Sequence, residues 1–583
     1  MLEDLRQVSS VVIRKPRIAS ARTDQLIWTA EIGLAALSFA AGGYIFFTTV
    51  MMVVNGWTGI PFWDQWWSGI FVEDQSFVSW LFSQNNEHRI AVPHIIFTID
   101  RELFENTDKF TFGYNIFSQL LLGIIIVTIY NLVDCRKIIW DQIWFIGTTL
   151  AILFSAMQYE NFLWGFQVAF TALALATVAT LATVVLRRPS AWTLAAIIGL
   201  ESIAVYTLVS GLLVPFLTVA LALWLRWPKR YVIVLTAAAC GLLGTYFYDY
   251  VAPQGASDAI HAGERLGDVL SYFLTLIGLP FGMAFNEAQV SHFKNWDRLC
   301  GAGGLALFLI ASFSILWRKA TRGPSLVFAA TALFALGMAL MTALGRLKFG
   351  SAQAMSSRYS TVMLIFWLSL IAIAALRLRA TKAWLRITAM AAILPLVLGL
   401  AYHQRSFAAN GRHWVLPRLQ ASTALLANVD DPTALAAIFF DDRLKNRVPF
   451  LRDRHLSIFA DNWSNWLGTP LADHVIISDR AQCFGGIDRV DPIHGSSPQG
   501  WRVGGWGWDT ERKTVPRRII IADGTGQVIG YGLSGFHKTD GREGGDWHGH
   551  FAMRLPGSIT AYALVQNGHA ACSLGHLAVS RNE

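Results

Sequence analysis

The chain has 583 residues, of which 54% are hydrophobic and only 15% are charged. Average soluble domains carry about 25% charged residues, so this composition excludes a single soluble globule. Much of the formal net charge of +8 lies in Arg and Lys clusters beside long apolar runs. Clusters in such places report membrane topology rather than nucleic-acid binding.

Cysteines and short motifs exclude several other classes. Cys135, Cys240, Cys300, Cys483 and Cys572 show no CxxC motif or metal-ligand spacing, so they support neither a zinc site nor a disulfide-rich secreted scaffold. Two of them, Cys483 and Cys572, lie in the polar C-terminal part, where a disulfide is possible. The chain has no Walker loop and no GxSxG motif, which leaves soluble nucleotide and hydrolase chemistry without support.

The apolar runs predict a polytopic α-helical membrane protein with about 11 transmembrane helices. The first run, near 27–54, follows a basic segment and is too long for a signal peptide, so it predicts a retained anchor with a cytoplasmic N-terminus. The other runs have the length that a helix needs to cross the hydrocarbon. They lie near 113–133, 138–157, 168–186, 191–210, 212–226, 231–252, 299–317, 325–344, 359–376 and 385–402.

Basic clusters occupy every second connection, which assigns those connections to the cytoplasm. One further apolar stretch, Leu266–Phe285, would place the cluster at 318–322 on the outer side if it crossed. We therefore expect a re-entrant or interfacial element that is broken at Pro280. An odd number of crossings then places the chain after His403 on the outer, periplasmic side.

The predicted domain organisation ends in a β-rich part. Segments such as GWRVGGWGWD, RRIIIAD and ITAYALVQ, separated by turn formers, predict an antiparallel β-sandwich. Before it, LPRLQASTALLANV indicates a helix, and AAIFF and HVIIS indicate short strands. The expected divisions are a cytoplasmic segment 1–25, a transmembrane domain 26–403 with a long first outer loop 55–112, a mixed α/β connecting segment 404–490 and the β-sandwich 491–583.

The first outer loop concentrates acids among tryptophans. Asp64 lies between Trp63 and Trp66, and partial desolvation there would raise its basicity and suit a general base. The alternative is an interfacial aromatic belt with solvated acids beside it. Further along the loop, Glu87 or His88 is expected to bind a divalent metal or an acceptor hydroxyl. Arg89 is expected to bind a phosphate or, alternatively, to anchor the loop through an ion pair.

Two later outer connections carry the other candidates. Glu160 and Gln167 are seven residues apart and share a helix face, with Asn161 and Trp164 nearby, as in sugar-binding sites; a helix-capping acid is the alternative. Arg346, Lys348 and Arg358 lie on the outer side against the charge trend. They are expected to clamp a phosphate or pyrophosphate, or else to anchor helix ends to lipid headgroups.

These features together resemble the GT-C class of integral-membrane glycosyltransferases. The resemblance covers most of the chain in architecture, and its motif content is Asp64, Glu87–His88–Arg89, Tyr159–Glu160–Asn161 and Ser357–Arg358–Tyr359. It implies a polyprenyl-phosphate-linked sugar donor, with Asp64 as the first-loop catalytic acid and Arg358 as a phosphate-binding residue. The C-terminal pattern is similar to carbohydrate-binding modules, so Trp501, Trp506, Trp508 and Trp547 are expected to stack on sugars or, alternatively, to form the domain's core.

The predicted function is inverting sugar transfer to a glycan, glycolipid or protein acceptor at the periplasmic face of a bacterial inner membrane. Asp64, Glu87 and His88 are the predicted catalytic residues, with Mg²⁺ or Mn²⁺ as a possible cofactor on Glu87 and His88. The predicted substrate-binding residues are Arg89, Tyr159, Glu160, Asn161, Trp164, Gln167, Arg346, Lys348, Arg358 and Tyr359. Expected partners are the lipid-linked donor, the acceptor and membrane lipids, and no nucleic acid.

Three other functions are weighed against this one. A flippase or transporter for a lipid-linked sugar needs ionisable residues along a transmembrane path, whereas here polar residues crowd the outer loops. An O-antigen-type polymerase or ligase has its long functional loop late in the chain. A surface-glycan receptor would rest on the C-terminal domain alone and leave the first loop unexplained.

Overall fold

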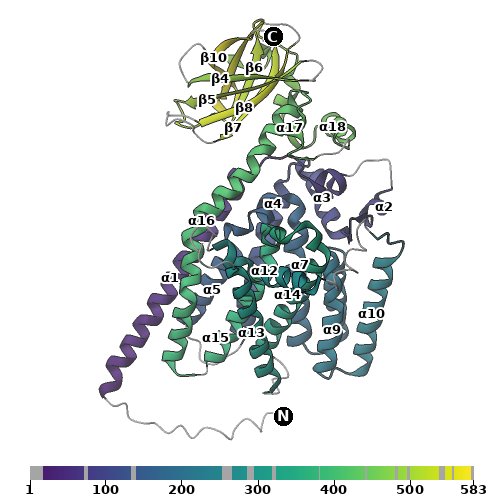
Figure 1. Cartoon of the computed structure of the whole chain (residues 1–583), viewed down its shortest axis with the longest axis vertical. Helices are drawn as coiled ribbons and strands as arrows, with labels where there is room; N and C mark the ends of the chain where they lie inside the picture. The colour runs from purple at the N-terminus through teal and green to yellow at the C-terminus, as the bar shows by residue number, and fades with distance from the viewer. Residues whose placement is uncertain are drawn as a thin grey trace.

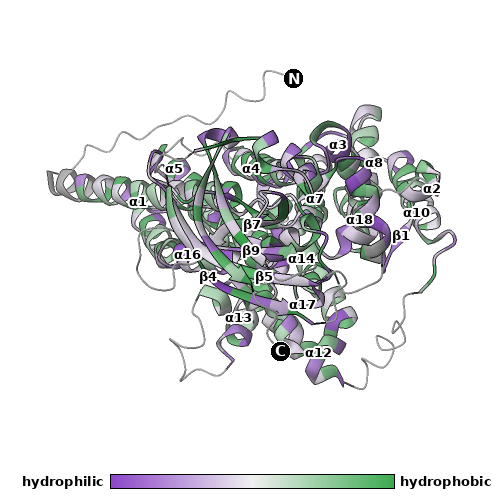
Figure 2. Cartoon of the chain, turned by 90° about the horizontal axis from the view of Figure 1, so that it is seen from above, coloured by the Kyte–Doolittle hydropathy of each residue, from purple (hydrophilic) through white to green (hydrophobic). Residues whose placement is uncertain are grey.

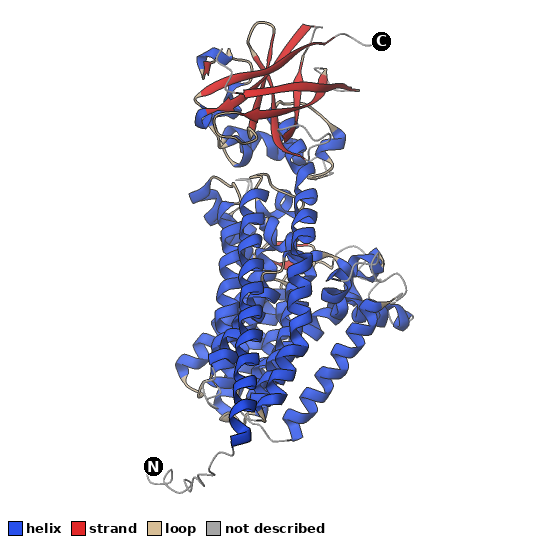
Figure 3. Cartoon of the chain, turned by 90° about the vertical axis from the view of Figure 1, so that its left-hand side faces the viewer, coloured by secondary structure: helices blue, strands red, loops and turns tan. Residues whose placement is uncertain are grey.

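A computed structural model describes residues 18–70, 76–132, 139–252, 265–284, 295–317, 323–379, 381–439, 443–478, 483–494, 499–536, 545–553 and 557–579. A bundle of helices makes up the lower part of the molecule, and a sheet sits above it (Figure 1). Figure 3 shows the same division by secondary structure, with the strands gathered at the C-terminal end. The basic clusters expected at 136–137 and 318–322, and most of the expected segment 1–25, lie outside the described residues.

Each of the eleven predicted apolar runs corresponds to a helix. They are α1 (Ile18–Gly56), α4 (Lys109–Asn131), α5 (Ile139–Leu153), α7 (Val168–Leu186), α8 (Ala191–Val205), α9 (Leu213–Trp224), α10 (Lys229–Phe247), α13 (Trp296–Trp317), α14 (Pro324–Arg346), α15 (Ser360–Arg379) and α16 (Ala383–Leu426). In the described part of the chain, ten helices are long and apolar enough to cross a membrane, and these include α12 (Leu266–Ala284) but not the shorter α8 and α9. The described residues therefore have the helices of a multi-pass membrane protein.

The expectation that Leu266–Phe285 is broken at Pro280 is wrong, because α12 runs through Pro280 to Ala284. Proline removes one backbone donor from the helix, and in membrane helices neighbouring groups can replace it. Here the indole Nε1 of Trp367 donates to the carbonyl of Ile277, three residues before the proline, at 2.8 Å. The carbonyl that Pro280 leaves without its helical donor is that of Leu276, and the helix continues through this point to Ala284.

The path of the chain around α12 agrees with an element that adds no net crossing. We call the end of the bundle that carries residues 57–108 the loop end. Helix α10 finishes there, since Arg89 donates to the carbonyl of Tyr246. Helix α13 begins there as well. A Cβ added to Gly282 of α12 would lie 3.2 Å from Asp297, in the first turn of α13, and 2.6 Å from Met355. Met355 belongs to the connection between Arg346 and Arg358, so the start of α13 lies beside that connection. Consequently α1 and α16 run in the same direction, toward the sheet (Figure 1).

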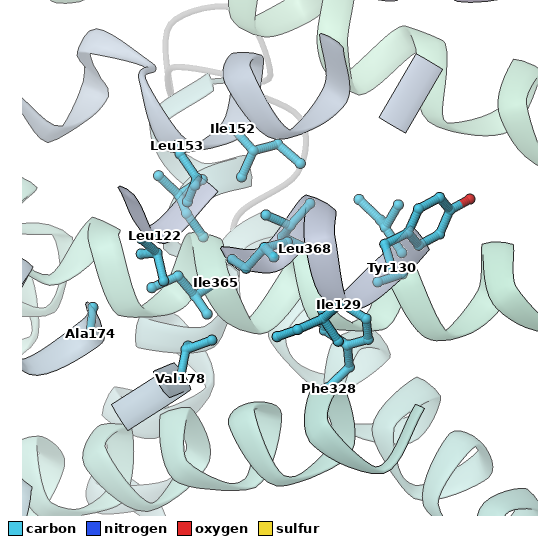
Figure 4. Close-up of a cluster of buried hydrophobic side chains, with 14 of the residues drawn as sticks. Leu122, Ile129, Tyr130, Ile152, Leu153, Ala174, Val178, Phe328, Ile365 and Leu368 are labelled. Atoms are coloured by element: carbon cyan, nitrogen blue, oxygen red, sulfur yellow. The ribbon is translucent and has the colours of Figure 1, made fainter. Parts of the chain in front are cut away.

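A large apolar cluster holds the bundle together. Side chains from α4, α5, α7, α14 and α15 meet in it (Figure 4). Polar pairs lie at the end opposite the loop end: Arg379 of α15 donates to Asp141 of α5 at 2.7 Å, and the Tyr130 hydroxyl donates to the same carboxylate at 2.9 Å. Close packing inside and paired charges at that end fix the relative positions of the helices.

Helix α16 is 44 residues long and continues past position 403 to Leu426. The transition from the membrane part to the C-terminal part therefore falls inside a helix, and LPRLQASTALL forms its last turns. The connecting segment then contains α17 (Pro432–Leu435), α18 (Arg443–Asp453) and the two-residue strand β3 (Ile476–Ile477). The described part of AAIFF forms a turn after α17 rather than a strand, because its apolar side chains Ile438 and Phe439 pack against the first outer loop.

The C-terminal strands form one eight-stranded sheet in the order β3-β10-β9-β6-β7-β8-β5-β4. The strands are β4 (Cys483–Ile493), β5 (Gly500–Asp509), β6 (Arg518–Asp523), β7 (Val528–Phe536), β8 (Gly545–Ala552), β9 (Gly557–Val565) and β10 (Ala570–Val579). The expectation of a two-sheet sandwich is wrong, because a single curled sheet brings β4 and β10 together as a half-barrel. A disulfide between Cys483 and Cys572 joins these two strands.

The tryptophans of the sheet serve mainly as core. Trp547 is 0% exposed and Trp501 is 9% exposed, and both pack inside the curled sheet. They are therefore unavailable for stacking on a sugar. Trp506 and Trp508 are partly exposed, and the ring of Trp506 meets that of Phe484 edge to face.

The other face of the sheet rests on the helices. A second apolar cluster joins Tyr531 and Val528 of β7 with the end of α16 and with Phe62 and Trp66 of the first outer loop. Viewed from the sheet side, the strands lie over the centre of the bundle and leave α2 (Phe77–Leu81), α8 and α10 to one side (Figure 2). The first outer loop is thus packed between the bundle and the C-terminal part.

Candidate functional site

Asp64 lies at a strained and well-anchored position in the first outer loop. It directly precedes a short π-helix, Gln65–Gly69. The residue before it, Trp63, has φ of +46°, in the left-handed region that non-glycine residues rarely adopt. The Trp63 backbone N–H donates to the carbonyl of Ile438 at 2.8 Å, and the Phe62 N–H donates to the Gln65 side chain at 3.2 Å. Strain of this kind persists where the surroundings fix the backbone, and it clusters at functional sites.

Three charged residues from distant parts of the chain surround Asp64. Burial raises the pKa of Asp64, the guanidinium groups of Arg358 and Arg346 lower it, and the carboxylate of Glu87 raises it. The net result is a pKa above the ordinary value. The structure thus brings four predicted site residues, Asp64, Glu87, Arg346 and Arg358, into one electrostatic neighbourhood.

Glu87 and His88 lie in a small hairpin, β1 (Gln84–Asn85) and β2 (His88–Arg89). The Arg346 guanidinium at the end of α14 donates to Glu87 Oε1, and His88 Nε2 lies 3.5 Å from the same oxygen. Although burial raises the pKa of Glu87, its neighbours His88 and Arg346 outweigh that effect and hold the pKa below its ordinary value. Glu87 is therefore a carboxylate that holds Arg346 in place.

His88 is a neutral imidazole in this setting. Burial lowers the pKa of His88 to about 4, and its Nδ1 accepts from the backbone N–H of Val209 at 3.3 Å. Since Nδ1 accepts, Nε2 carries the hydrogen and points to Glu87. With Glu87 committed to Arg346, these two side chains do not fit a metal site, and the described residues contain no group of three His, Cys, Asp or Glu side chains placed to hold one.

Arg89 is a loop anchor in the structure. Its Nε donates to the carbonyl of Tyr246 at 2.7 Å and its Nη1 to that of Phe82 at 2.7 Å, while its Nη2 donates to that of Tyr248. These three bonds tie the hairpin to the end of α10. Because each guanidinium nitrogen already donates to a backbone carbonyl, the structure supports Arg89 as a loop anchor rather than as the predicted phosphate ligand.

The second outer loop supports the backbone around Arg358. The Glu160 N–H donates to Ser357 Oγ at 3.2 Å, and Ser356 Oγ donates to Glu160 Oε1 at 3.2 Å. Asn161 Nδ2 donates to the carbonyl of Arg358 at 3.0 Å and to Thr361 at 2.8 Å. Glu160 and Asn161, predicted to bind sugar, therefore position Arg358, whose own Nε is buried without a hydrogen-bond partner among the described residues.

The remaining predicted substrate-binding residues are three aromatic residues, one glutamine and one lysine. Trp164 and Gln167 are buried, and the Trp164 indole donates to the carbonyl of Phe62 at 3.0 Å, so Trp164 braces the segment before Asp64. Tyr159 packs against Trp414, and Tyr359 is buried against Phe170. Lys348 is exposed, and its ammonium lies 5.4 Å from the centre of the Phe349 ring.

Two residues that the sequence did not single out complete the surroundings. Arg418 of α16 is 2% exposed, lies 3.7 Å from the ring centres of both Phe62 and Trp414, and donates to the carbonyl of Leu163 at 2.8 Å. Asp108 Oδ1 accepts a hydrogen bond at 2.8 Å from the side-chain amide of Gln65, the residue that follows Asp64. Burial and the nearby Asp100 raise the pKa of Asp108. The one sequence signal that could have indicated Arg418 is its place as a charged residue within LPRLQASTALL, a segment predicted to be helical.

Comparisons with known proteins add no name to this site. No protein-family model, no curated protein and no solved structure matches the chain.

Proposed function

We propose that this protein is a GT-C-like glycosyltransferase that transfers a sugar, with inversion, from a polyprenyl-phosphate-linked donor to a glycan, glycolipid or protein acceptor. The single observation that carries the proposal is the neighbourhood of Asp64: a carboxylate of raised basicity faces Arg346 and Arg358 at one end of an apolar helix bundle. A base beside two guanidinium groups suits the attack of a hydroxyl on a sugar whose leaving group is a phosphate.

In the proposed reaction, Asp64 acts on the acceptor hydroxyl and the two arginines act on the leaving phosphate. Asp64 takes the proton of the acceptor hydroxyl as its oxygen forms a bond to the anomeric carbon from the face opposite the phosphate. The bond between that carbon and the phosphate oxygen breaks, and its electron pair stays on the phosphate. The lipid phosphate thereby gains a negative charge, which Arg358 and Arg346 stabilise. The proposed reaction uses no metal ion on Glu87, because Glu87 Oε1 already accepts a hydrogen bond from Arg346.

The same proposal places the loop end and the sheet on the periplasmic side of a bacterial inner membrane. The disulfide between Cys483 and Cys572 fits an oxidising compartment. At the opposite end, Arg377 and Arg379 end α15 and Lys382 precedes α16, as expected for a cytoplasmic connection. A long apolar lipid tail of the donor would then lie against the membrane part while its phosphate reaches the arginines.

The test is Asp64→Asn in the full-length protein, purified in detergent. Polyprenyl-phosphate-linked hexoses and pentoses are supplied with membrane glycolipids as acceptors, and the release of polyprenyl phosphate is measured. Loss of a general base is expected to slow release by about 10²–10⁴-fold. The matched control is Glu102→Gln, since Glu102 is an exposed acid of the same loop paired only with its neighbour Arg101 in the described contacts.

Two results would contradict the proposal. Release by the Asp64→Asn protein at a rate near that of the wild type would remove Asp64 from the mechanism. Failure of the wild-type protein to release polyprenyl phosphate from any of these donors would remove the donor class itself.

A further inference from the structure

Helix α12 brings a buried phenol to the arginines of the proposed site. Tyr272 is 0% exposed, and its hydroxyl has no hydrogen-bond partner among the described residues. Buried polar groups are nearly always paired, and an unpaired one costs folding free energy, so each exception asks for an explanation. Sequence reasoning placed Tyr272 in an apolar stretch and assigned it no role.

The electrostatic neighbours of the Tyr272 hydroxyl are the residues of the phosphate site. Tyr272 packs in one apolar cluster with Ala354, Met355 and Tyr359, which belong to the segment that carries the two arginines. The charges of Arg346 and Arg358 act on its hydroxyl, as does the phenol of Tyr359. The Nε of Arg358 is buried and also lacks a partner in the described part of the chain. Guanidinium groups can only donate hydrogen bonds, and a phenol can donate one. A group that satisfies these donors together is an acceptor-rich anion.

The position of Tyr272 is held by close packing of α12 on α13. A Cβ on Gly278 would lie 1.7 Å from the carbonyl oxygen of Asp297, so only glycine permits this approach. Thr275 donates to the Asp297 carboxylate at 2.7 Å, and Trp367 donates to the carbonyl of Ile277 at 2.8 Å. Three contacts within two turns of Tyr272 therefore fix its helix, as a preorganised donor requires.

We propose that Tyr272 is a third phosphate ligand, which donates its phenolic hydrogen to the donor phosphate that Arg346 and Arg358 bind. This inference rests on the proposed function and deepens it, because it assigns α12 to the leaving-group side of the reaction. The phosphate is a diester with one negative charge in the donor and becomes a monoester with a second charge after transfer. The Tyr272 hydrogen bond therefore strengthens as the bond to the sugar breaks.

The experiment measures lipid binding, which does not require transfer. Wild-type protein, Tyr272→Phe and Arg358→Ala are titrated in detergent with a long-chain polyprenyl phosphate and, separately, with the uncharged polyprenol. Tyr272→Phe keeps the ring and removes only the hydroxyl. The control is Tyr130→Phe, which removes a buried hydroxyl at the opposite end of the bundle, where it donates to Asp141.

The expected result is that Tyr272→Phe weakens binding of polyprenyl phosphate by about tenfold, the usual effect of one hydrogen bond to a charged group. Binding of polyprenol stays unchanged, and Tyr130→Phe binds both lipids as the wild type does. If Tyr272→Phe binds the phosphate normally while Arg358→Ala does not, this inference is overturned and the proposed function stands. If the wild type does not prefer the phosphate to polyprenol, both are overturned.

Discussion

The Arg346 guanidinium donates to Glu87 Oε1 although the two residues are 259 positions apart in the chain. The contact joins the end of α14 to the hairpin of the first outer loop. The charge of Arg346 also lowers the pKa of Asp64, whereas that of Glu87 raises it. The pair therefore holds one of the proposed phosphate ligands in place and adjusts the basicity of the proposed base.

Replacement of Glu87 by Gln is expected to change the pH dependence of transfer. Because the Glu87 charge raises the pKa of Asp64, its removal lowers that pKa. The reaction needs Asp64 as a carboxylate, so the acid limb of the pH–rate profile moves to lower pH. The measurement is initial rate against pH for the wild type, Glu87→Gln and the exposed control Glu102→Gln. A shift to higher pH, or the same shift in the control, would contradict this.

Asp64→Asn is expected to melt at a temperature no lower than that of the wild type at pH 7. The raised pKa of Asp64 means that the folded protein disfavours the ionised form. Stability that is present while Asp64 is protonated is thus lost as the pH rises through its folded pKa. Asn removes that cost at neutral pH. A thermal-unfolding curve in detergent tests this, and a clearly lower melting temperature would show that the Asp64 carboxylate is a structural group.

Arg89→Ala is expected to lower stability without weakening the binding of a polyprenyl phosphate by the folded protein. The substitution removes a partly buried hydrogen bond to the carbonyl of Tyr246 and an exposed one to that of Phe82, so the expected loss of stability is about 1 kcal/mol. Thermal unfolding and lipid titration separate the two effects. Arg358→Ala serves as the comparison, with weaker lipid binding expected. A loss of binding in Arg89→Ala as large as that in Arg358→Ala would restore Arg89 as a ligand.

Asp431 is expected to be a stability group that links the end of α16 to the sheet. Its carboxylate accepts from Arg502 Nε and Nη2 at 2.6 Å each and from His550 Nε2 at 2.9 Å. Burial raises the pKa of Asp431, but these hydrogen bonds outweigh it and hold that pKa well below the ordinary value. The stabilisation is therefore present above the unfolded pKa of about 4 and is lost as the pH falls below it.

Asp431→Asn should consequently destabilise the protein by about 2 kcal/mol at pH 7, the usual effect of hydrogen bonds to a charged group, since the Arg502 side chain that loses its partner is 39% exposed. The difference from the wild type should shrink at acidic pH, where the wild-type carboxylate also becomes protonated. Unfolding at several pH values tests both statements. A constant difference at all pH values would mean that the charge of Asp431 contributes nothing.

The disulfide between Cys483 and Cys572 is expected to stabilise the sheet. It links residues 89 positions apart, and removal of a native disulfide costs about 2–5 kcal/mol. The double variant Cys483→Ser, Cys572→Ser should unfold at a lower temperature than the wild type. Treatment of the wild type with a reductant should reproduce the shift and leave the double variant unchanged. Equal sensitivity of both proteins to the reductant would contradict this.

Much of the fold was predictable from local sequence. Apolar runs of membrane-spanning length predicted a helix at each of eleven places. Of these helices, α8 and α9 are shorter than a candidate span, whereas α12, which was expected to be re-entrant or interfacial, is long and apolar enough to cross. Strand positions such as Gly500–Asp509 also follow from local pattern. The expected break at Pro280 failed because a proline removes only one backbone donor from a helix, and α12 continues through it to Ala284. The sandwich failed because strand pattern does not distinguish a single curled sheet from two stacked ones.

The candidate site was predictable only as a set of residue types. The sequence indicated Asp64, Glu87, Arg346 and Arg358, because charges beside tryptophans and against the positive-inside trend are unusual. It also indicated Arg89 as a phosphate ligand, yet the structure commits that side chain to three backbone carbonyls. Nothing local distinguishes an arginine that binds a carbonyl from one that faces an open donor site.

The sequence by itself determined that this protein has long apolar helices, the form that hydrocarbon requires whatever their partners. Only the tertiary structure decided which side chains meet. Glu87 reaches Arg346 through the packing of whole helices, and Tyr272 comes under the charges of Arg346 and Arg358. Helix contacts depend on close approach at points such as Gly278 and Asp297, and no spacing along the chain encodes them.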